Sequence, residues 1–470
     1  MPCPSPAGSS PSPRAPPCPR RPHRDARCHA CDSPRLSGSP RTLMPLRSPL
    51  PTAAKEPVSR HAAWGHVLQA AAALAAGMGV GRFVFTPIVP LMHTQARLSP
   101  GAGAHLATAN YVGYLVGALA GILAPSFVRS TALLRASLVV LVVSLAAMPM
   151  THSTSVWMTS RLLAGVASAL VFVIAVSSLL SHLREHPAHL PGWAFGGVGA
   201  GIALSGLLVL AVRSFADWRA AWWASALLAA LLSVQAWNLR PEAASQSPAA
   251  KAGHDSGGGV ARTARTGRWF TALFASYTLE GVGYIVAGTF LVAAIEQGSP
   301  GWIGGGAWVV VGLAALPSSA LWAWLGRRWS RPGLLWAALV IQAVGIALPA
   351  LFEGVPAALI SAVLFGATFI GISTLALGTG AHLRFPRSVA LLTAGYSVGQ
   401  IVGPLLVAPL LQHGYRQALL LASGVVLAAA GSAAVLRCGF PHEMVVTHPG
   451  MTDGRSGTAT PVAAPEGSAG

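Results

Sequence analysis

A long apolar run from about Trp64 to Met92 constrains the fold of this chain more than any other feature. It is long enough to cross a bilayer as one helix, yet residues 77–87 read GMGVGRFVFTP. An arginine deep in hydrocarbon costs about 2.5 kcal/mol or more on insertion scales, so Arg82 should face protein or water. The glycines allow another backbone to approach closely, and Pro87 and Pro90 interrupt the helical hydrogen bonds. We therefore predict an irregular membrane helix that carries a buried charge.

Eleven further apolar segments follow, separated by polar breaks. The predicted segments cover about 64–92, 104–124, 131–150, 155–180, 191–212, 218–238, 268–293, 302–325, 333–352, 356–382, 388–411 and 416–437. The chain is 53% hydrophobic and 9% charged, against about 25% charged residues in soluble domains. We expect an all-α integral membrane protein with twelve transmembrane helices.

The polar stretches divide the chain into five parts. Residues 1–60 form a Pro/Arg-rich tail that we expect to be disordered. A true translation start at Met44 is one explanation for it, and a basic leader retained on the cytoplasmic side is the alternative. Residues 61–239 and 268–438 each hold six apolar segments, and residues 240–267 form a polar linker. Residues 439–470 are a second polar tail, also predicted to be disordered.

The formal charge of +18 comes from scarce carboxylates and from basic residues in the ends and breaks. No basic face with interleaved aromatic residues occurs, so we predict no nucleic-acid partner. The five cysteines form no disulfide framework. Cys28 and Cys31, with His29 between them and His23 nearby, look like half of a metal knuckle. No second pair follows, so we predict no metal and no cofactor.

Lysine and arginine are unevenly divided between the two sets of breaks. The odd-numbered breaks hold only Arg97, Arg213, Arg219 and Arg416, and the even-numbered ones hold Arg129, Arg135, Arg184, Arg240, Lys251, Arg262, Arg265, Arg268, Arg327, Arg328, Arg331, Arg384 and Arg387. Because basic loops stay on the cytoplasmic side, we expect both termini and the linker to be cytoplasmic. The membrane would be the inner or plasma membrane.

The second set of six segments repeats the first at an offset of about 200 residues. Residues 281–284 read GVGY, so Tyr284 stands where Arg82 stood and Glu280 where Met78 stood. Further matched positions are Gly199 with Gly399, Leu163 with Leu364, and Trp218-Arg219 with Tyr415-Arg416. Six segments in each half predict a parallel repeat, which is how many transporters are built.

Several motifs resemble the major facilitator superfamily. Arg161 and Gly165 look like the Arg-x-x-x-Gly signature of its fourth helix, and residues 326–331 stand where a basic cytoplasmic signature follows its eighth helix. The aspartate usual in that signature is absent here. Residues 79–87 and 109–117 look like the YbfB/YjiJ branch, as do the glycine-rich stretches 196–202 and 399–404. The resemblance implies a secondary transporter that works by alternating access, without naming a substrate.

Polar residues inside the apolar segments are the candidates for substrate binding. They are Arg82, Asn110, Tyr111, Tyr114, Tyr284 and Gln400, with Tyr396 a further candidate. Arg82 would bind an anion or orient the substrate; alternatively it would hydrogen-bond to carbonyls freed by the Gly/Pro irregularity. The residues at 110, 111 and 114 would line a cavity or join helices by hydrogen bonds. The glycines at 196–201 and 395–403 are interpreted as packing and bending devices.

Two residues are candidates for coupling transport to an ion gradient. Glu280 is the only carboxylate near the middle of a segment, and it would carry a proton or form a fixed salt bridge with Arg82 or Arg161. In proton-driven members of the superfamily that this chain resembles, the arginine at the position of Arg161 has been linked to coupling. A structural hydrogen-bonding role for Arg161 is the alternative.

These observations favour secondary active transport of a small organic solute, either an organic anion or another polar compound, coupled to protons. No phosphate-binding loop of the Walker type occurs, which argues against an ATP-driven pump. An efflux exporter of hydrophobic compounds and a non-transporting sensor on a transporter scaffold are the alternatives. The histidines lie mainly in tails and breaks, so we predict no enzyme. The expected partners are the solute, protons and the lipid bilayer, and we expect a monomer.

Overall fold

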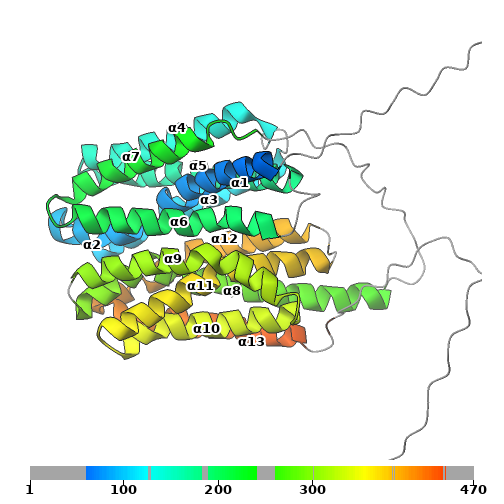
Figure 1. Cartoon of the computed structure of the whole chain (residues 1–470). Coiled ribbons are helices and arrows are strands. Elements are labelled where there is room, and N and C mark those ends of the chain that lie inside the picture. Colours follow the sequence, from blue (N-terminus) through cyan, green and yellow to red (C-terminus); the bar gives the residue numbers. More distant parts are fainter. Residues whose placement is uncertain are drawn as a thin grey trace, which may run out of the picture. The chain divides into compact units, whose positions relative to one another are not determined.

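The computed structural model describes residues 60–124, 129–182, 189–240, 260–299, 301–383, 385, 387–437 and 440. All the described helices belong to one compact unit, and no strand occurs in these ranges (Figure 1). The predicted tails apart from residues 60 and 440 lie outside the described residues, as do most of the predicted linker, Met44 and all five cysteines.

Helices cover all the predicted apolar segments. Those of the first half are α1 Arg60–Leu74, η1 Ala75–Val80, α2 Phe85–Gln95, α3 Pro100–Leu123, α4 Thr131–Ala147, η3 Met148–Met150, α5 Thr154–His182, α6 His189–Val212 and α7 Trp218–Ala236. Those of the second half are α8 Val260–Gly298, α9 Gly301–Leu325, α10 Arg331–Leu351, α11 Val355–His382, α12 Ser388–Val407, η4 Leu410–His413 and α13 Tyr415–Arg437.

Helix α8 begins at Val260, inside the stretch 240–267 that was predicted to be the linker. Residues 260–266 read VARTART, with neither glycine nor proline. Alanine and arginine are good helix formers, so the helix continues through a stretch that is polar but compatible with helical structure. Hydropathy marks where lipid begins rather than where a helix begins.

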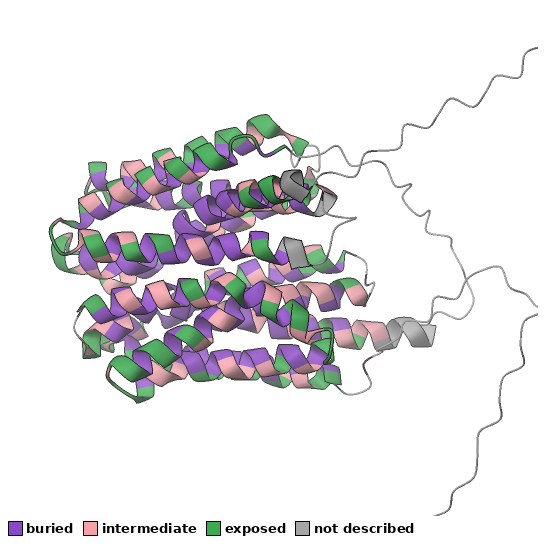
Figure 2. Ribbon diagram, in the orientation of Figure 1, coloured by how far each residue is buried: buried purple, intermediate pink, exposed green. Residues whose placement is uncertain are grey.

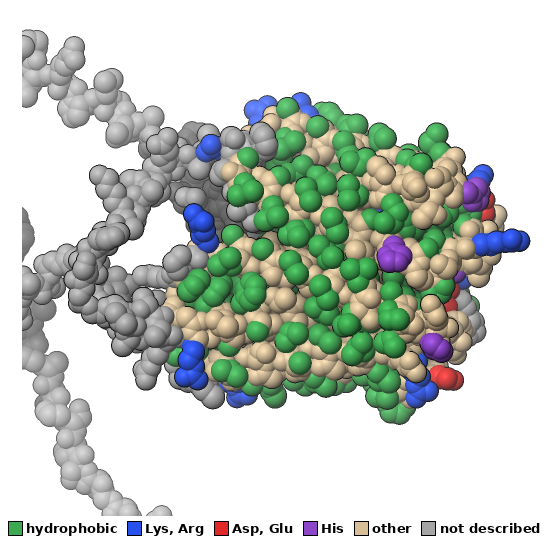
Figure 3. Space-filling view, turned by 180° about the vertical axis from the view of Figure 1, so that it is seen from behind, with side chains coloured by type: hydrophobic (Ala, Val, Ile, Leu, Met, Phe, Trp, Pro, Cys, Tyr) green, Lys and Arg blue, Asp and Glu red, His purple; other side chains and the backbone are tan. Residues whose placement is uncertain are grey.

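Among the described helices, ten are long and apolar enough to cross a membrane; α3 and α7 lie outside this set. Buried residues occupy the faces that the helices turn towards one another (Figure 2). Large apolar side chains remain exposed on the outer faces, including Leu68, Val143, Leu207, Leu231 and Val234. Charged side chains gather at the two ends of the helices (Figure 3). An apolar surface of this extent fits a lipid environment.

The helices of the two halves pack in matching pairs. In the first half, α3 packs on α5, α4 on α5 and α7, and α1 with η1 on α6 and α7. In the second half, α9 packs on α11, α10 on α11 and α13, and α8 on α12 and α13. Between the halves, α6 packs on α9, α3 on α12, and α2 on α8.

Each half contains an equivalent hydrogen bond, and the two bonds lie at the same end of the helices. Gln95 Oε1, at the end of α2, accepts from the backbone N–H of Trp218 at 2.7 Å. Gln297 Oε1, near the end of α8, accepts from the backbone N–H of Tyr415 at 3.0 Å. Each glutamine therefore binds an N–H at the start of the last helix of its half, a group that has no partner within that helix.

Glycines let helix backbones meet directly in both halves. A Cβ atom at Gly79 would lie 2.5 Å from the Cα atom of Gly201, and one at Gly403 would lie 2.5 Å from the carbonyl oxygen of Val282. Across the halves, a Cβ atom at Gly199 would lie 2.7 Å from the carbonyl oxygen of Gly312. These contacts agree with the interpretation of the glycines as packing devices.

Gly79→Ala should lower the apparent melting temperature of the detergent-purified protein. The new methyl group overlaps backbone atoms of α6 that cannot rotate away, and overpacking of this kind costs about 1–3 kcal/mol. Gly424→Ala is the matched control, because a Cβ atom there meets nothing within 4 Å. Melting followed by size-exclusion chromatography measures both variants, and equal temperatures would contradict the assigned contact.

Candidate substrate site

The first membrane helix is broken at its middle. Helix α1 passes into the π-helical turn η1, in which Gly81 N–H donates to Ala76 O at 2.9 Å. The Thr86 N–H then donates to Phe83 O at 3.2 Å rather than to Arg82 O, and Pro87 has no N–H to donate. The Arg82 carbonyl therefore loses its helical donor inside the membrane region, where an unpaired carbonyl is costly. For the Gly81 carbonyl, too, no backbone N–H donor occurs among the turn and cap hydrogen bonds of the described residues.

Arg161 on α5 supplies the missing donors. Its Nη1 donates to Gly81 O at 3.3 Å and its Nη2 to Arg82 O at 3.2 Å. The guanidinium carbon lies 4.7 Å from the centre of the Phe85 ring, and the side chain is 1% exposed. This structural role was one of the two alternatives predicted for Arg82. In the structure Arg161 fills it, while its predicted role in coupling stays a prediction.

Asn110 on α3 fixes the position of α5. Its Nδ2 donates to the backbone carbonyl of Arg161 at 2.9 Å. Gly165, one turn further along α5, lies against the carbonyl oxygen of Asn110, where any side chain would overlap it. Of the two roles predicted for Asn110, the structure shows the interhelical hydrogen bond.

Arg82 lies where the two halves meet. The side chain is 2% exposed, and its Nη2 donates to Oε1 of Gln400 on α12 at 2.5 Å. The guanidinium carbon lies 4.2 Å from the ring centre of Tyr114 and 4.9 Å from that of Tyr111. The sequence predicted these four residues as one site, and the structure brings them together.

Two nitrogens of this arginine have no hydrogen-bond partner. Nε and Nη1 of Arg82 are buried and unpaired in the part of the chain that the structure describes. The neighbouring Tyr111 is already occupied, since its hydroxyl shares a hydrogen bond of 2.8 Å with Thr289 on α8. An unpaired N–H of a buried cation is expensive. Arg82 is therefore a buried cation with two N–H-bearing nitrogens, Nε and Nη1, available to bind an acceptor.

Glu280 on α8 is fully buried, and no ion pair joins it to Arg82 or Arg161. The polar side chain that interacts with it is Gln342 on α10, without a hydrogen bond of normal geometry. Among the described residues, the ion pair is instead Arg213 with Glu296, at 2.6 Å. The fixed salt bridge predicted as one alternative for Glu280 is thus not formed in this conformation.

Five aromatic rings form a stack beside Arg82, here called the ring stack: Tyr277, Tyr284, Phe365, Phe369 and Tyr396. Tyr284 was predicted as a site residue and Tyr396 as a further candidate, whereas the other three were missed. Phe365 and Phe369 lie four residues apart on one face of α11, and Tyr277 and Tyr284 lie seven apart on α8. Spacings of four and seven residues place these aromatic side chains on one face of their helix, and this pattern was the sequence signal that could have identified them.

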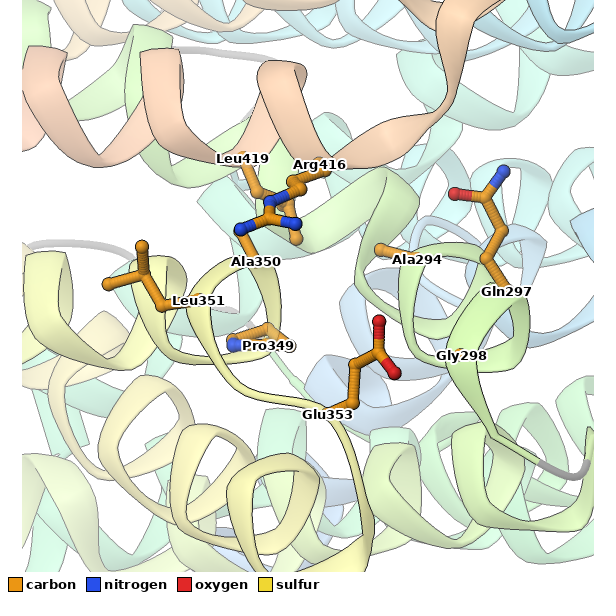
Figure 4. Close-up of a pocket in the computed structure, with 9 residues that line it drawn as sticks. All are labelled: Ala294, Gln297, Gly298, Pro349, Ala350, Leu351, Glu353, Arg416 and Leu419. Atoms are coloured by element: carbon orange, nitrogen blue, oxygen red, sulfur yellow. The ribbon is translucent and has the colours of Figure 1, made fainter.

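A separate pocket of about 140 Å³ opens at one end of the second half. The ends of α8 and α10 and the start of α13 form it, and none of the predicted site residues lines it. Figure 4 shows Glu353 and Arg416 among its lining side chains. The candidate site around Arg82 is distinct from this pocket.

Residues 74–434 match the model of a family described as "Uncharacterised MFS-type transporter YbfB", where MFS denotes the major facilitator superfamily. The chain belongs to this family. The match confirms the predicted resemblance to the YbfB branch, and with the ten apolar helices it identifies a multi-pass membrane protein of a transporter family. A comparison with curated proteins gave no match.

Two solved structures that this chain resembles are those of nucleoside transporter NupG and of a point mutant of it. Each superimposes with a TM-score of 0.59 at 13% sequence identity. The matches cover 80% of this chain and 99% of NupG, and 79% and 98% for the mutant. At this identity the likeness shows a shared fold.

Arg161→Ala should lower the apparent melting temperature and increase hydrogen exchange at residues 81–86. The substitution leaves two buried carbonyls unpaired, at about 1–3 kcal/mol for each. The exposed Arg327 provides a matched control, Arg327→Ala. Exchange followed by mass spectrometry in detergent or nanodiscs makes the measurement. Unchanged exchange at 81–86 would show that Arg161 does not hold the broken helix.

Proposed function

We propose that this protein is a secondary active transporter that moves a small organic anion by alternating access, coupled to protons. One observation carries the proposal: Arg82 is buried at the contact between the halves, bonded across it to Gln400, with two nitrogens unpaired. A carboxylate or a similar anion would satisfy both charge and hydrogen bonding, and charge-assisted bonds of this kind are strong.

The proposal includes twelve membrane-spanning helices in two parallel repeats of six. The matched helix pairs of the halves support it, as does the equivalent hydrogen bond of Gln95 and of Gln297. In transporters built from repeats, substrate sites lie at the interface between the repeats, near the middle of broken helices. Arg82 stands at such a position.

Contacts that join the halves between the site and one end of the helices support alternating access. Thr86 Oγ1 donates to Gly288 O at 2.5 Å, and the Tyr415 hydroxyl lies 3.0 Å from His93 Nε2. The Arg213–Glu296 ion pair also joins the halves. This is the end with few basic residues, which we assign to the outside, so the termini would be cytoplasmic.

Glu280 is the proposed proton carrier. A carboxyl buried in the membrane region without a cationic partner favours its neutral form, and exposure to water would allow it to ionise. Alternating exposure of Glu280 to the two sides would therefore move protons. Arg161 would contribute indirectly, because it holds the chain segment that carries Arg82.

The decisive experiment measures uptake of labelled organic acids into proteoliposomes with and without an imposed pH gradient. We expect an acid to accumulate only with the gradient. Glu280→Gln should abolish accumulation but keep exchange of acid for acid, because the site stays intact. Arg82→Ala should lose both, with a loss of about 100-fold or more for a charge-assisted pair of ~3 kcal/mol.

Uridine serves as an uncharged control, because the structurally similar NupG is described as a nucleoside transporter. Accumulation of uridine in place of every acid would contradict the assignment of Arg82 to an anion. Equal transport by wild type, Arg82→Ala and Glu280→Gln would contradict both assigned roles. Export of hydrophobic dyes that is insensitive to Arg82→Ala would favour the efflux alternative.

The proposed role of the Arg213–Glu296 ion pair in closing the outer end can be tested by labelling. In a cysteine-free background with Thr86→Cys, Arg213→Gln should increase labelling by a membrane-impermeant maleimide added outside. Loss of the ion pair, at ~1 kcal/mol, would raise the open population about fivefold. The matched control is Arg219→Gln, since Arg219 bonds His152 within the first half at 2.6 Å. Equal labelling in both variants would show that the ion pair does not hold this end closed.

A further inference from the structure

The ring stack and the unpaired nitrogens of Arg82 belong to one region, and their combination narrows the chemistry of the substrate. The proposal below rests on the proposed transport of an anion and concerns which anions are transported.

The rings of the stack are close to parallel. Tyr284 lies at 7° to Phe369 and 15° to Tyr396, with ring centres 5.5 and 5.7 Å apart. Tyr277 continues the stack on Tyr396, at 12° and 4.4 Å. Phe365 lies at 9° to Phe369 and 6.2 Å from it. Rings from α8, α11 and α12 thus share one orientation, the offset arrangement that aromatic pairs favour.

The stack reaches Arg82 through Phe83. The Phe83 ring lies 5.5 Å from the guanidinium carbon of Arg82 and meets Phe369 edge-on at 5.7 Å. Tyr284 and Tyr396 are also within electrostatic reach of the Arg82 charge. Phe83 therefore links the cation of the first half to the parallel rings of the second half.

Each half supplies a different kind of contact. The unpaired Nε and Nη1 of Arg82 suit the oxygens of a carboxylate. The stack suits a flat ring in the same offset orientation. A ring alone would leave Nε and Nη1 of Arg82 without hydrogen-bond partners, and a short aliphatic acid would gain nothing from the parallel orientation of the rings.

From this juxtaposition we propose that the transported anion is a planar aromatic carboxylate, whose carboxylate binds Arg82 and whose ring packs against the ring stack. Substrate selection is then divided between the halves, because the first half recognises the charge and the second half recognises the flat ring. Both groups are in place only when the halves are together around the substrate.

The test compares two acids of similar size, benzoate and cyclohexanecarboxylate, in the proteoliposome assay. Wild type should show a KM for benzoate about three- to tenfold lower, the effect of one aromatic contact. Phe369→Leu and Tyr284→Leu should bring the ratio of the two KM values towards one, while Tyr284→Phe keeps it. Phe172→Leu is the matched control, since Phe172 pairs with Phe195 inside the first half.

The outcomes separate this inference from the proposed function. Equal KM values for the two acids in wild type, with transport still lost in Arg82→Ala, would overturn the aromatic preference and leave anion transport standing. A ratio that survives both leucine substitutions would also overturn it, because the preference would arise elsewhere. Failure to transport any acid would overturn both. The wild-type comparison decides even if a leucine variant does not fold.

Discussion

The hydrogen bonds from Arg161 to the carbonyls of Gly81 and Arg82 are the interaction on which the rest of the site depends. A helix broken inside the membrane region exposes backbone groups that no water can satisfy, so the break persists only with an internal donor. One guanidinium supplies two donors at once. Arg161 is itself fixed from α3, through Asn110. Because Arg161 binds these carbonyls, the side chain of Arg82 can extend to the other half, where it donates to Gln400.

The contact between the two halves depends in turn on the close approach of helix backbones. The helix pair α6 and α9 joins the halves with direct backbone contact at small residues, such as Gly199 and Gly312. Contacts of this kind are stabilised by van der Waals packing of the two backbones and do not require large side chains to insert deeply between the helices. Under the proposed function, such surfaces can slide or rock, while polar contacts at one end, among them Arg213 with Glu296, open and close.

The sequence predicted site residues where a polar side chain occurs inside an apolar segment. Arg82, Tyr111 and Gln400 are polar side chains in apolar segments, and burial there is costly enough to predict a shared site. Phe365 and Phe369 were missed because an aromatic residue in an apolar helix looks the same whether it faces lipid, core or substrate. The partners of Arg161 lie 79 and 80 residues away in sequence. Such contacts depend on how helices pack, which hydropathy does not encode.

The separation of Glu280 from the arginines has a consequence for coupling. A fixed pair with Arg82 would neutralise both groups, and neither an anion nor a proton could then bind without first breaking it. In the structure Arg82 bonds Gln400, while Glu280 lies beside Gln342. Under the proposed function each group thus keeps its own ligand, and both act on the same helix rearrangement. Proton and anion would be coupled through the conformation of the halves rather than through a direct bond between their binding residues.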